Sequence, residues 1–289
     1  MGAYSSSNSG NTSELSLLTA NLEEATDFVI ERARQLVNRL VESRGREGPP
    51  FLAEELAPLQ GIKEVVKANL GEPSALLFRL PDGYIIKVNS NHPQVRQNFS
   101  CAHEIGHTFL HKLENQAATG VAEFRTLAPH IDGWTKERLC DVAATELLMP
   151  ESVFRKYLSG FGVSVDSIEP LAHAFQVSRL AVARRIAEVS QEPSVAILWE
   201  RQQKTKSKGF RVAWCEGPGR KSRGISYYMP EYQYVRDPST LFKAYQSDTC
   251  VKSYRVFEFC NTKKRCYTES KGFGYNERRY VVSLAFPER

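Results

Sequence analysis

The sequence predicts an α+β protein, with a mainly helical region followed by a β-rich one. Up to about residue 190, amphipathic helical patterns alternate with short β-branched runs. From Ser194 on, runs such as "VAILWE", "FRVAWC" and "YRVFEFC" are rich in β-branched and aromatic residues, which favour strands. The charge changes at the same place. Residues 193–289 hold 19 Lys and Arg against 9 Asp and Glu, a net charge of +10, whereas the preceding residues hold 19 against 24, a net charge of −5.

These changes divide the 289 residues into four segments. We expect a disordered Ser/Asn/Gly tail at 1–18, a first domain at 19–160, a paired-helix segment at 161–192 and a basic β-rich domain at 193–289. No apolar run approaches the roughly 18 residues that a membrane span needs. The six cysteines form no CxxC pair, which is typical of a reducing compartment. We therefore expect a cytoplasmic protein without a membrane partner.

The first domain begins with an amphipathic helix over 19–43. Short β-like runs follow at 62–67, 75–80 and 84–88, and the last two flank "PDG", a hairpin signal. Residues 92–113 then read as a long helix with Pro93 near its first turn. Residues 135–150 predict a second strong helix, with Thr135 as N-cap and Pro150 at its end.

Two short helices are predicted in the region 164–190, joined at "QVS" and with Ser178 capping the second. The strands expected after them include "YYMPEYQYV" and "RRYVVSLAF".

The stretch "FSCAHEIGHTFLH" contains an H-E-x-x-H motif at His103, Glu104 and His107. On a helix, residues four apart lie on one face, so both imidazoles can reach one metal ion. Glu104 projects to an adjoining face, where it can act as a general base without being a ligand. This spacing predicts a catalytic metal site, with zinc as the default ion and manganese as an alternative.

Such a site needs a third protein ligand, and the helix at 135–150 offers Glu137, Asp141 and Glu146. Glu137 and Asp141 share one face. We expect Glu137 to ligate the metal and Asp141 to accept the free N–H of a metal-bound histidine, most simply His103. Glu146 lies about 180° around the helix from Glu137 and is excluded.

Two further histidines lie near the motif in sequence. His111, two turns past His103, is about 12 Å along the helix axis and too far to complete the site. His130, in the loop before the second helix, is a candidate transition-state donor.

Together, "RQNFSCAHEIGHTFLH" and "ERLCDVAATELLMPESVF" resemble the ImmA/IrrE family of gluzincin-type metallopeptidases. The resemblance covers roughly residues 54–155. It implies a gluzincin-like peptidase domain with His103, His107 and Glu137 as ligands, Glu104 as general base and Asp141 behind a ligand. It also implies that 164–190 is helix-turn-helix-like, and that the β-rich domain takes the place of the GAF-like sensory domain of longer members.

The resemblance further implies a protein substrate, a helix-turn-helix repressor of the XRE type. Its cleavage would derepress stress-response or mobile-element genes. We expect that substrate to run extended along "YIIKV", as an added edge strand.

The alternative is a regulatory protein with a vestigial peptidase fold that binds DNA or a small effector. Its support is the paired helices and the basic segments "KTKSKGFR", "GRKSRG" and "TKKR". The two readings combine if the basic domain controls the peptidase.

Overall fold

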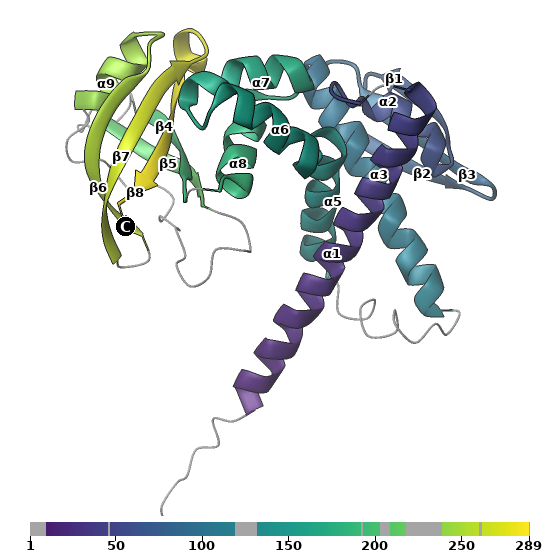
Figure 1. The fold of residues 1–289 in the computed structure, drawn as a ribbon. Helices are drawn as coiled ribbons and strands as arrows, with labels where there is room; N and C mark the ends of the chain where they lie inside the picture. Colours follow the sequence, from purple (N-terminus) through teal and green to yellow (C-terminus); the bar gives the residue numbers. More distant parts are fainter. Residues whose placement is uncertain are drawn as a thin grey trace, which may run out of the picture. The chain divides into compact units, whose positions relative to one another are not determined.

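The computed structural model describes residues 10–45, 47–118, 132–191, 193–202, 209–217, 239–259 and 262–288. The chain divides into two compact units, Met1–Pro150 and Glu151–Arg289. Both contain helices and a sheet (Figure 1), which confirms the α+β class. The division differs from the expected boundaries at 160 and 192, because the paired-helix segment falls in the same unit as the β-rich region. None of the described helices has the length and apolar character of a membrane span.

Three long helices form the framework of the first unit: α1 (Gly10–Arg44), α3 (Gln94–Ala118) and α5 (Gly133–Leu148). They pack against one another, and α1 packs mainly against α5 while it crosses α3 (Figure 1). The short helices α2 (Ala53–Leu56) and η1 (Pro58–Gln60) follow α1. The buried apolar side chains at the centre include Val29, Ala33 and Leu36 of α1, Ile105 and Phe109 of α3, and Ala143 and Leu147 of α5.

Helix boundaries depart from expectation at two places. Helix α1 begins at Gly10, so residues 10–18 of the expected tail are helical. The Glu, Leu and Ala residues of "SELSLLTA" are good helix formers, and they extend the pattern that follows them. Residues 1–9 lie outside the described residues. Helix α5 is capped by the Asp132 side chain, which accepts from the Thr135 N–H, whereas we had expected Thr135 itself to be the N-cap.

The sheet of the first unit has the order β1-β3-β2. Strands β2 (Ala75–Leu80) and β3 (Gly83–Asn89) form the predicted hairpin, and β1 (Ile62–Ala68) pairs parallel to β3 on its other side. The expectation that "YIIKV" is an edge strand is therefore wrong, because both edges of β3 are already hydrogen-bonded. The pairing of β1 links residues about twenty positions apart and has no local signal in the sequence.

The second unit starts with α6 (Glu151–Phe161), η3 (Val165–Ser167), α7 (Ile168–Phe175) and α8 (Arg179–Val189). The Ser178 side chain accepts from the Ala181 N–H, which confirms the predicted cap of α8. From Val182 to Val189 helix α8 is buried apart from Arg184 and Glu188, whereas its first turn, Arg179 to Ala181, is half-buried.

A five-stranded antiparallel sheet of order β5-β4-β8-β7-β6 completes this unit. Its strands are β4 (Val195–Gln202), β5 (Gly209–Glu216), β6 (Val251–Phe259), β7 (Thr262–Phe273) and β8 (Tyr280–Pro287), and α9 (Ser239–Gln246) and η4 (Asn276–Arg278) lie between strands. Strand β7 and helix α9 were not predicted. The sequence of β7, "TKKRCYTESK", is too polar to predict a strand, although β7 is an interior strand of the sheet. The expected strand "YYMPEYQYV" lies outside the described residues.

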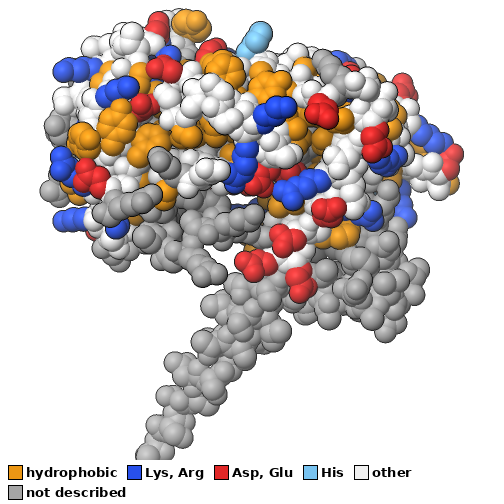
Figure 2. Space-filling model, viewed as in Figure 1, with side chains coloured by type: hydrophobic (Ala, Val, Ile, Leu, Met, Phe, Trp, Pro, Cys, Tyr) orange, Lys and Arg blue, Asp and Glu red, His pale blue; other side chains and the backbone are white. Residues whose placement is uncertain are grey.

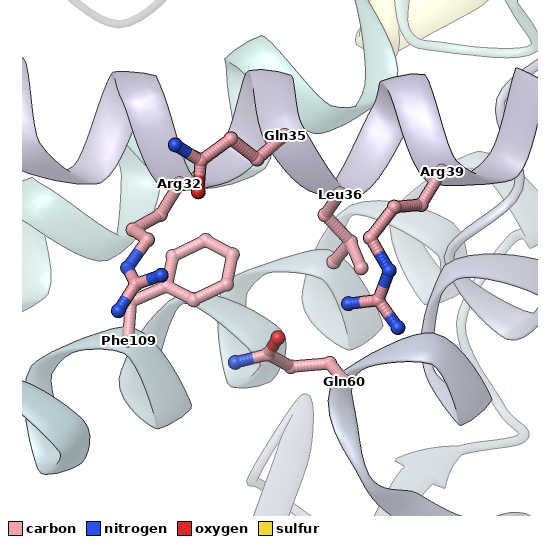
Figure 3. A pocket seen from close by; sticks show the side chains of 6 residues that line it. All are labelled: Arg32, Gln35, Leu36, Arg39, Gln60 and Phe109. Carbon is pink, nitrogen blue, oxygen red and sulfur yellow. The ribbon is translucent and has the colours of Figure 1, made fainter.

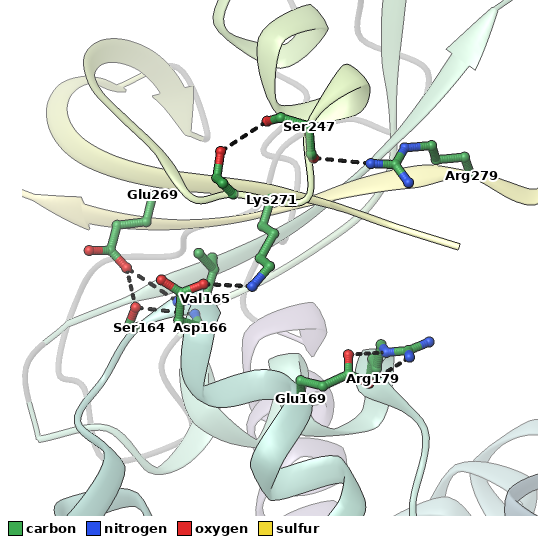
Figure 4. Close-up of polar contacts among 10 residues, drawn as sticks. Ser164, Val165, Asp166, Glu169, Arg179, Ser247, Glu269, Lys271 and Arg279 are labelled. Atoms are coloured by element: carbon green, nitrogen blue, oxygen red, sulfur yellow. Dashed lines mark hydrogen bonds and ion pairs between the residues drawn. The ribbon is translucent and has the colours of Figure 1, made fainter. Parts of the chain in front are cut away.

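Both faces of this sheet are covered. One face packs against α9 around a core that contains Trp199, Phe210 and Phe257. Because side chains alternate along a strand, Glu269 of β7 points to the opposite face. There its carboxylate accepts from the Ser164 hydroxyl at 2.6 Å and from the Val165 N–H at 3.2 Å (Figure 4). These bonds tie the helical segment to the sheet.

Candidate metal centre

Helix α3 places His103 and His107 side by side, as the motif predicts. Their ring centroids are 5.0 Å apart, with the rings inclined at 70°. The opposite face of the helix is anchored by buried Ala102, Ile105 and Phe109. Since that apolar face cannot turn outward without exposing core side chains, both imidazoles are held on the side that faces α5.

Helix α5 brings Glu137 to both histidines. Its Oε2 lies 3.1 Å from Nε2 of His103, and its Oε1 lies 3.5 Å from Nε2 of His107. One carboxylate thus spans the two ring nitrogens that point away from the helix. The approach of Glu137 to the histidines depends on the packing of α3 against α5, because His103 and Glu137 are 34 positions apart in sequence.

Gly106 makes this packing close. A Cβ at this position would lie 3.0 Å from the Cα of Cys140 and 3.2 Å from the Cβ of Ala143. Both distances are shorter than ordinary carbon–carbon contacts of about 3.5–4.0 Å. The absence of a side chain at Gly106 therefore sets the separation of α3 and α5, and with it the reach of Glu137.

Asp141 orients His103 from the other side. Its Oδ1 lies 2.9 Å from Nδ1 of His103, a hydrogen bond in which the imidazole N–H donates. This bond places the ring proton on Nδ1 and leaves the Nε2 lone pair facing Glu137.

That arrangement tests whether the residues fit a metal ion. With the proton on Nδ1, Nε2 of His103 and the Glu137 carboxylate are both acceptors, and either a second proton on Nε2 or a metal cation between the two atoms satisfies both. Two ligand atoms on a tetrahedral zinc ion, with bonds of about 2.0–2.1 Å, lie roughly 3.3–3.4 Å apart. The observed nitrogen–oxygen separations of 3.1 and 3.5 Å agree with this. The donor set therefore fits zinc.

The site also shifts the titration of the two histidines. Burial disfavours a charged His103, but the hydrogen bond and the charge of Asp141, together with Glu104 and Glu137, outweigh burial and raise the pKa of His103. Burial, followed by the charge of His103, lowers the pKa of His107. The pair thus divides into one imidazole that holds its added proton more strongly and one that releases it more readily.

Glu104, the acidic residue of the motif, is half-buried. Burial is the main cause that raises the pKa of its carboxyl, and the charge of Glu137 adds to it, while His103 opposes the shift. This shift moves the pKa of the Glu104 carboxyl toward neutral pH, and a carboxyl with a pKa near the working pH both accepts and returns a proton efficiently.

Cys140 is a further neighbour of the histidines that is not among the ligands predicted from the sequence. One ligand atom from each of His103, His107 and Cys140 lies within 4.8 Å of the others. The thiol is fully buried, and burial is the main cause that raises its pKa. The signal that pointed to it is its position three residues after Glu137, on the side of α5 that meets α3.

The remaining sequence candidates lie apart from this cluster. His111 stacks against Tyr84 of β3, with ring centroids 6.0 Å apart. Glu146 is buried and pairs with Arg34 of α1 at 3.0 Å, on the side of α5 away from the histidines. His130 lies outside the described residues.

Comparison with known proteins shows what this region resembles. Residues 61–187 match the family described as the IrrE N-terminal-like domain, a peptidase family. The match covers both sequence motifs and confirms the family resemblance that was based on them. Two curated proteins that this segment resembles are each named radiation response metalloprotease IrrE.

The one from Deinococcus radiodurans is 30% identical over 122 residues, which are 40% of this chain and 34% of that protein. The one from Deinococcus deserti is 29% identical over 122 residues, 40% of each. The matched segment thus spans well under half the length of these relatives.

One solved structure extends the likeness beyond the peptidase region. A Mycobacterium tuberculosis transcriptional regulator superposes with a TM-score of 0.55 at 16% sequence identity, over 92% of this chain and 81% of that one. At this identity the likeness shows a shared fold.

Proposed function

We propose that this protein is a metal-dependent endopeptidase of the gluzincin type. The observation that carries the proposal is the convergence of one carboxylate on two histidines, with Asp141 behind His103. In this proposal His103, His107 and Glu137 hold the metal, and Glu104 is the general base. The match to a peptidase family and the named metalloprotease relatives support it.

A divalent metal held by these residues would polarise the scissile carbonyl and lower the pKa of a coordinated water. Glu104 accepts the proton of the attacking water and then delivers it to the leaving amine. Asp141 keeps the His103 ring in one tautomer, so that Nε2 remains available. Partial burial of Glu104 and of both imidazoles limits competing solvent and strengthens the charges that act on the substrate.

Glu137 suits the third ligand position better than Cys140 does. Its oxygens lie at the separations that a zinc site requires, and a carboxylate is ionised at neutral pH. The buried Cys140 thiol would have to lose a proton that its surroundings retain. We therefore expect Glu137→Gln to abolish stoichiometric zinc binding and Cys140→Ala to retain it. The opposite result would reassign the ligand.

The substrate would pair with β2. This strand is an edge of the sheet and packs beside α3, whereas the other edge strand, β1, packs against η1. Leu76 and Phe78 stand on one face of β2 with 39% and 41% of their surface exposed. An extended peptide that hydrogen-bonds to β2 would cover such side chains, as in other cases of strand addition.

The substrate class that we propose is a helix-turn-helix repressor of the XRE type, cleaved once to release transcription of stress-response or mobile-element genes. The family resemblance supports this class, and the words "radiation response" in the relatives' names are compatible with it. Manganese remains an alternative to zinc, since both accept His and carboxylate ligands.

The DNA-binding alternative loses part of its support. In a helix-turn-helix reader the second helix presents one face to the major groove. Here the fully exposed residues of α8 are Arg184 and Glu188, and the Arg184 guanidinium lies 4.5 Å from the ring centroid of Trp214. The half-buried Arg179 is paired with Glu169. Of the basic segments, "GRKSRG" and most of "KTKSKGFR" lie outside the described residues. On the face that Figure 2 shows, the described Lys and Arg side chains are interspersed with Asp and Glu.

The deciding experiment is co-expression of the chain with candidate helix-turn-helix repressors. We expect one discrete, metal-dependent cut with the wild type and none with Glu104→Gln, which should still bind zinc. The matched control is Glu64→Gln, an exposed carboxylate on β1, which should cleave normally. Full cleavage by Glu104→Gln would refute the mechanism. An electrophoretic shift at several salt concentrations, without any cleavage, would favour the DNA-binding reading.

A further inference from the structure

A polar pocket lies on the side of α1 that meets α3 and η1. It is lined by Arg32, Gln35, Leu36, Arg39, Gln60 and Phe109 (Figure 3), and its free volume, including open solvent, is about 320 Å³. Leu36 and Phe109 are almost fully buried and form its apolar base. These residues are separate from the metal-site residues His103, His107 and Glu137.

Two arginines supply the charge of the pocket. Arg32 and Arg39 are seven residues apart on α1, about two turns or roughly 10 Å along the axis. In Figure 3 both guanidinium groups extend from α1 toward the space between the elements. Among the ion pairs of the described residues, neither arginine has a carboxylate partner, and the Arg32 guanidinium lies 5.4 Å from the ring centroid of Phe28. By contrast, Arg34 and Arg44 of the same helix both have acidic partners.

Two amide side chains complete the lining. The Gln35 amide nitrogen donates to Glu31 at 3.0 Å, and its oxygen points toward the pocket (Figure 3). Gln60 is buried, and its amide nitrogen donates to the Thr108 hydroxyl at 3.0 Å. The pocket thus offers guanidinium donors for an anion, together with amide oxygens that accept from hydroxyl groups.

We propose that this pocket binds a small phosphate monoester that carries hydroxyl groups. Two guanidinium groups provide two positive charges and planar pairs of N–H donors, which match the oxygens of a phosphate. A phosphate monoester carries about −1.5 to −2 charges near neutral pH, so it balances both arginines, whereas one carboxylate balances only one. The Gln35 and Gln60 amide oxygens would accept from the hydroxyl groups of the ester.

The pocket contacts the helix that carries the histidines. The Thr108 hydroxyl, which accepts from Gln60, donates to the Ile105 carbonyl at 2.6 Å. In sequence, Ile105 lies between His103 and His107, and Phe109 of the pocket lies two residues after His107. A ligand that contacts Gln60 is therefore two hydrogen bonds from the metal-binding turn of α3.

The test is ligand binding to the full chain by isothermal titration calorimetry at constant ionic strength, with inorganic phosphate and ribose 5-phosphate as probes and chloride as the reference. We expect saturable binding of both probes, with ribose 5-phosphate the tighter. The double variant Arg32→Gln/Arg39→Gln should bind at least about tenfold more weakly for each arginine removed. The charge-matched control Arg79→Gln/Arg278→Gln, at two exposed arginines outside the pocket, should bind as the wild type does.

Unchanged binding in the double variant, or equal loss in the control, would overturn the assignment. Equal affinity for the two probes would overturn the role of the amide oxygens. If the double variant fails to fold, the single variant Arg39→Gln, at an exposed position, provides the same comparison. None of these measurements involves proteolysis, so they test the proposal independently of the peptidase function.

Discussion

Substitution of Gly106 by alanine tests how the metal site is assembled. The added Cβ would lie 3.0 Å from the Cα of Cys140, 3.2 Å from its carbonyl oxygen and 3.2 Å from the Cβ of Ala143. Two of these atoms belong to the backbone and cannot move alone, so α3 and α5 must separate. Restoring contacts of about 3.5 Å or more requires a shift of about half an ångström.

The expected magnitudes follow from that shift. Overpacking of a core typically costs about 1–3 kcal/mol, whereas alanine gains about 1 kcal/mol over glycine within a helix. We expect Gly106→Ala to lower the free energy of unfolding by about 1 kcal/mol net. A functional site tolerates displacements of only about 0.5 Å, so zinc affinity should fall about tenfold or more as Glu137 moves away.

The assay is urea unfolding of the metal-free protein, combined with zinc competition against a chromogenic chelator. Gly160→Ala provides the matched control, because Gly160 lies in α6 and a Cβ there meets nothing within 4 Å. That variant should gain up to about 1 kcal/mol and keep its zinc affinity. If Gly106→Ala matched Gly160→Ala in both measurements, the argument that Gly106 sets the helix separation would be refuted.

Three other predictions concern single side chains, two in the first unit and one in the second. Asp141→Asn should weaken zinc binding about 10–100-fold with little loss of stability, as chelator competition and urea unfolding would show, because it removes the charge that orients a ligand histidine. Arg34→Met should destabilise the protein by about 1–3 kcal/mol in urea, since the carboxylate of Glu146, 3% exposed, loses a charged partner; unchanged stability would show that the pair contributes nothing. The hydrogen bond with Arg179 is the main cause that lowers the pKa of Glu169, so the pair stabilises the fold above the ordinary glutamate pKa, and this contribution disappears as the pH falls through the lowered value. Unfolding between pH 3 and pH 6 should therefore depend less steeply on pH in Glu169→Gln, and identical slopes would contradict the assignment.

Local patterns determine much of this protein. The i, i+4 spacing of His103 and His107 fixes their common face, because helical geometry depends only on nearby residues. The β2–β3 hairpin and the Ser178 cap are likewise local, and all three agree with the sequence prediction. The candidate residues Glu137 and Asp141 could also be chosen from the spacing within one helix.

Long-range packing decided the rest. The sequence could propose Glu137, but only the contact of α5 with Gly106 brings its carboxylate to both imidazoles and places Cys140 beside them. The pairing of β1 made β3 a central strand, and the sheet of the second unit buried most of α8. The arginine pocket likewise exists only where α1, η1 and α3 meet. Such contacts join residues far apart in the chain, and the free energy that selects them comes from burying whole apolar faces, which periodicity within one segment does not reveal.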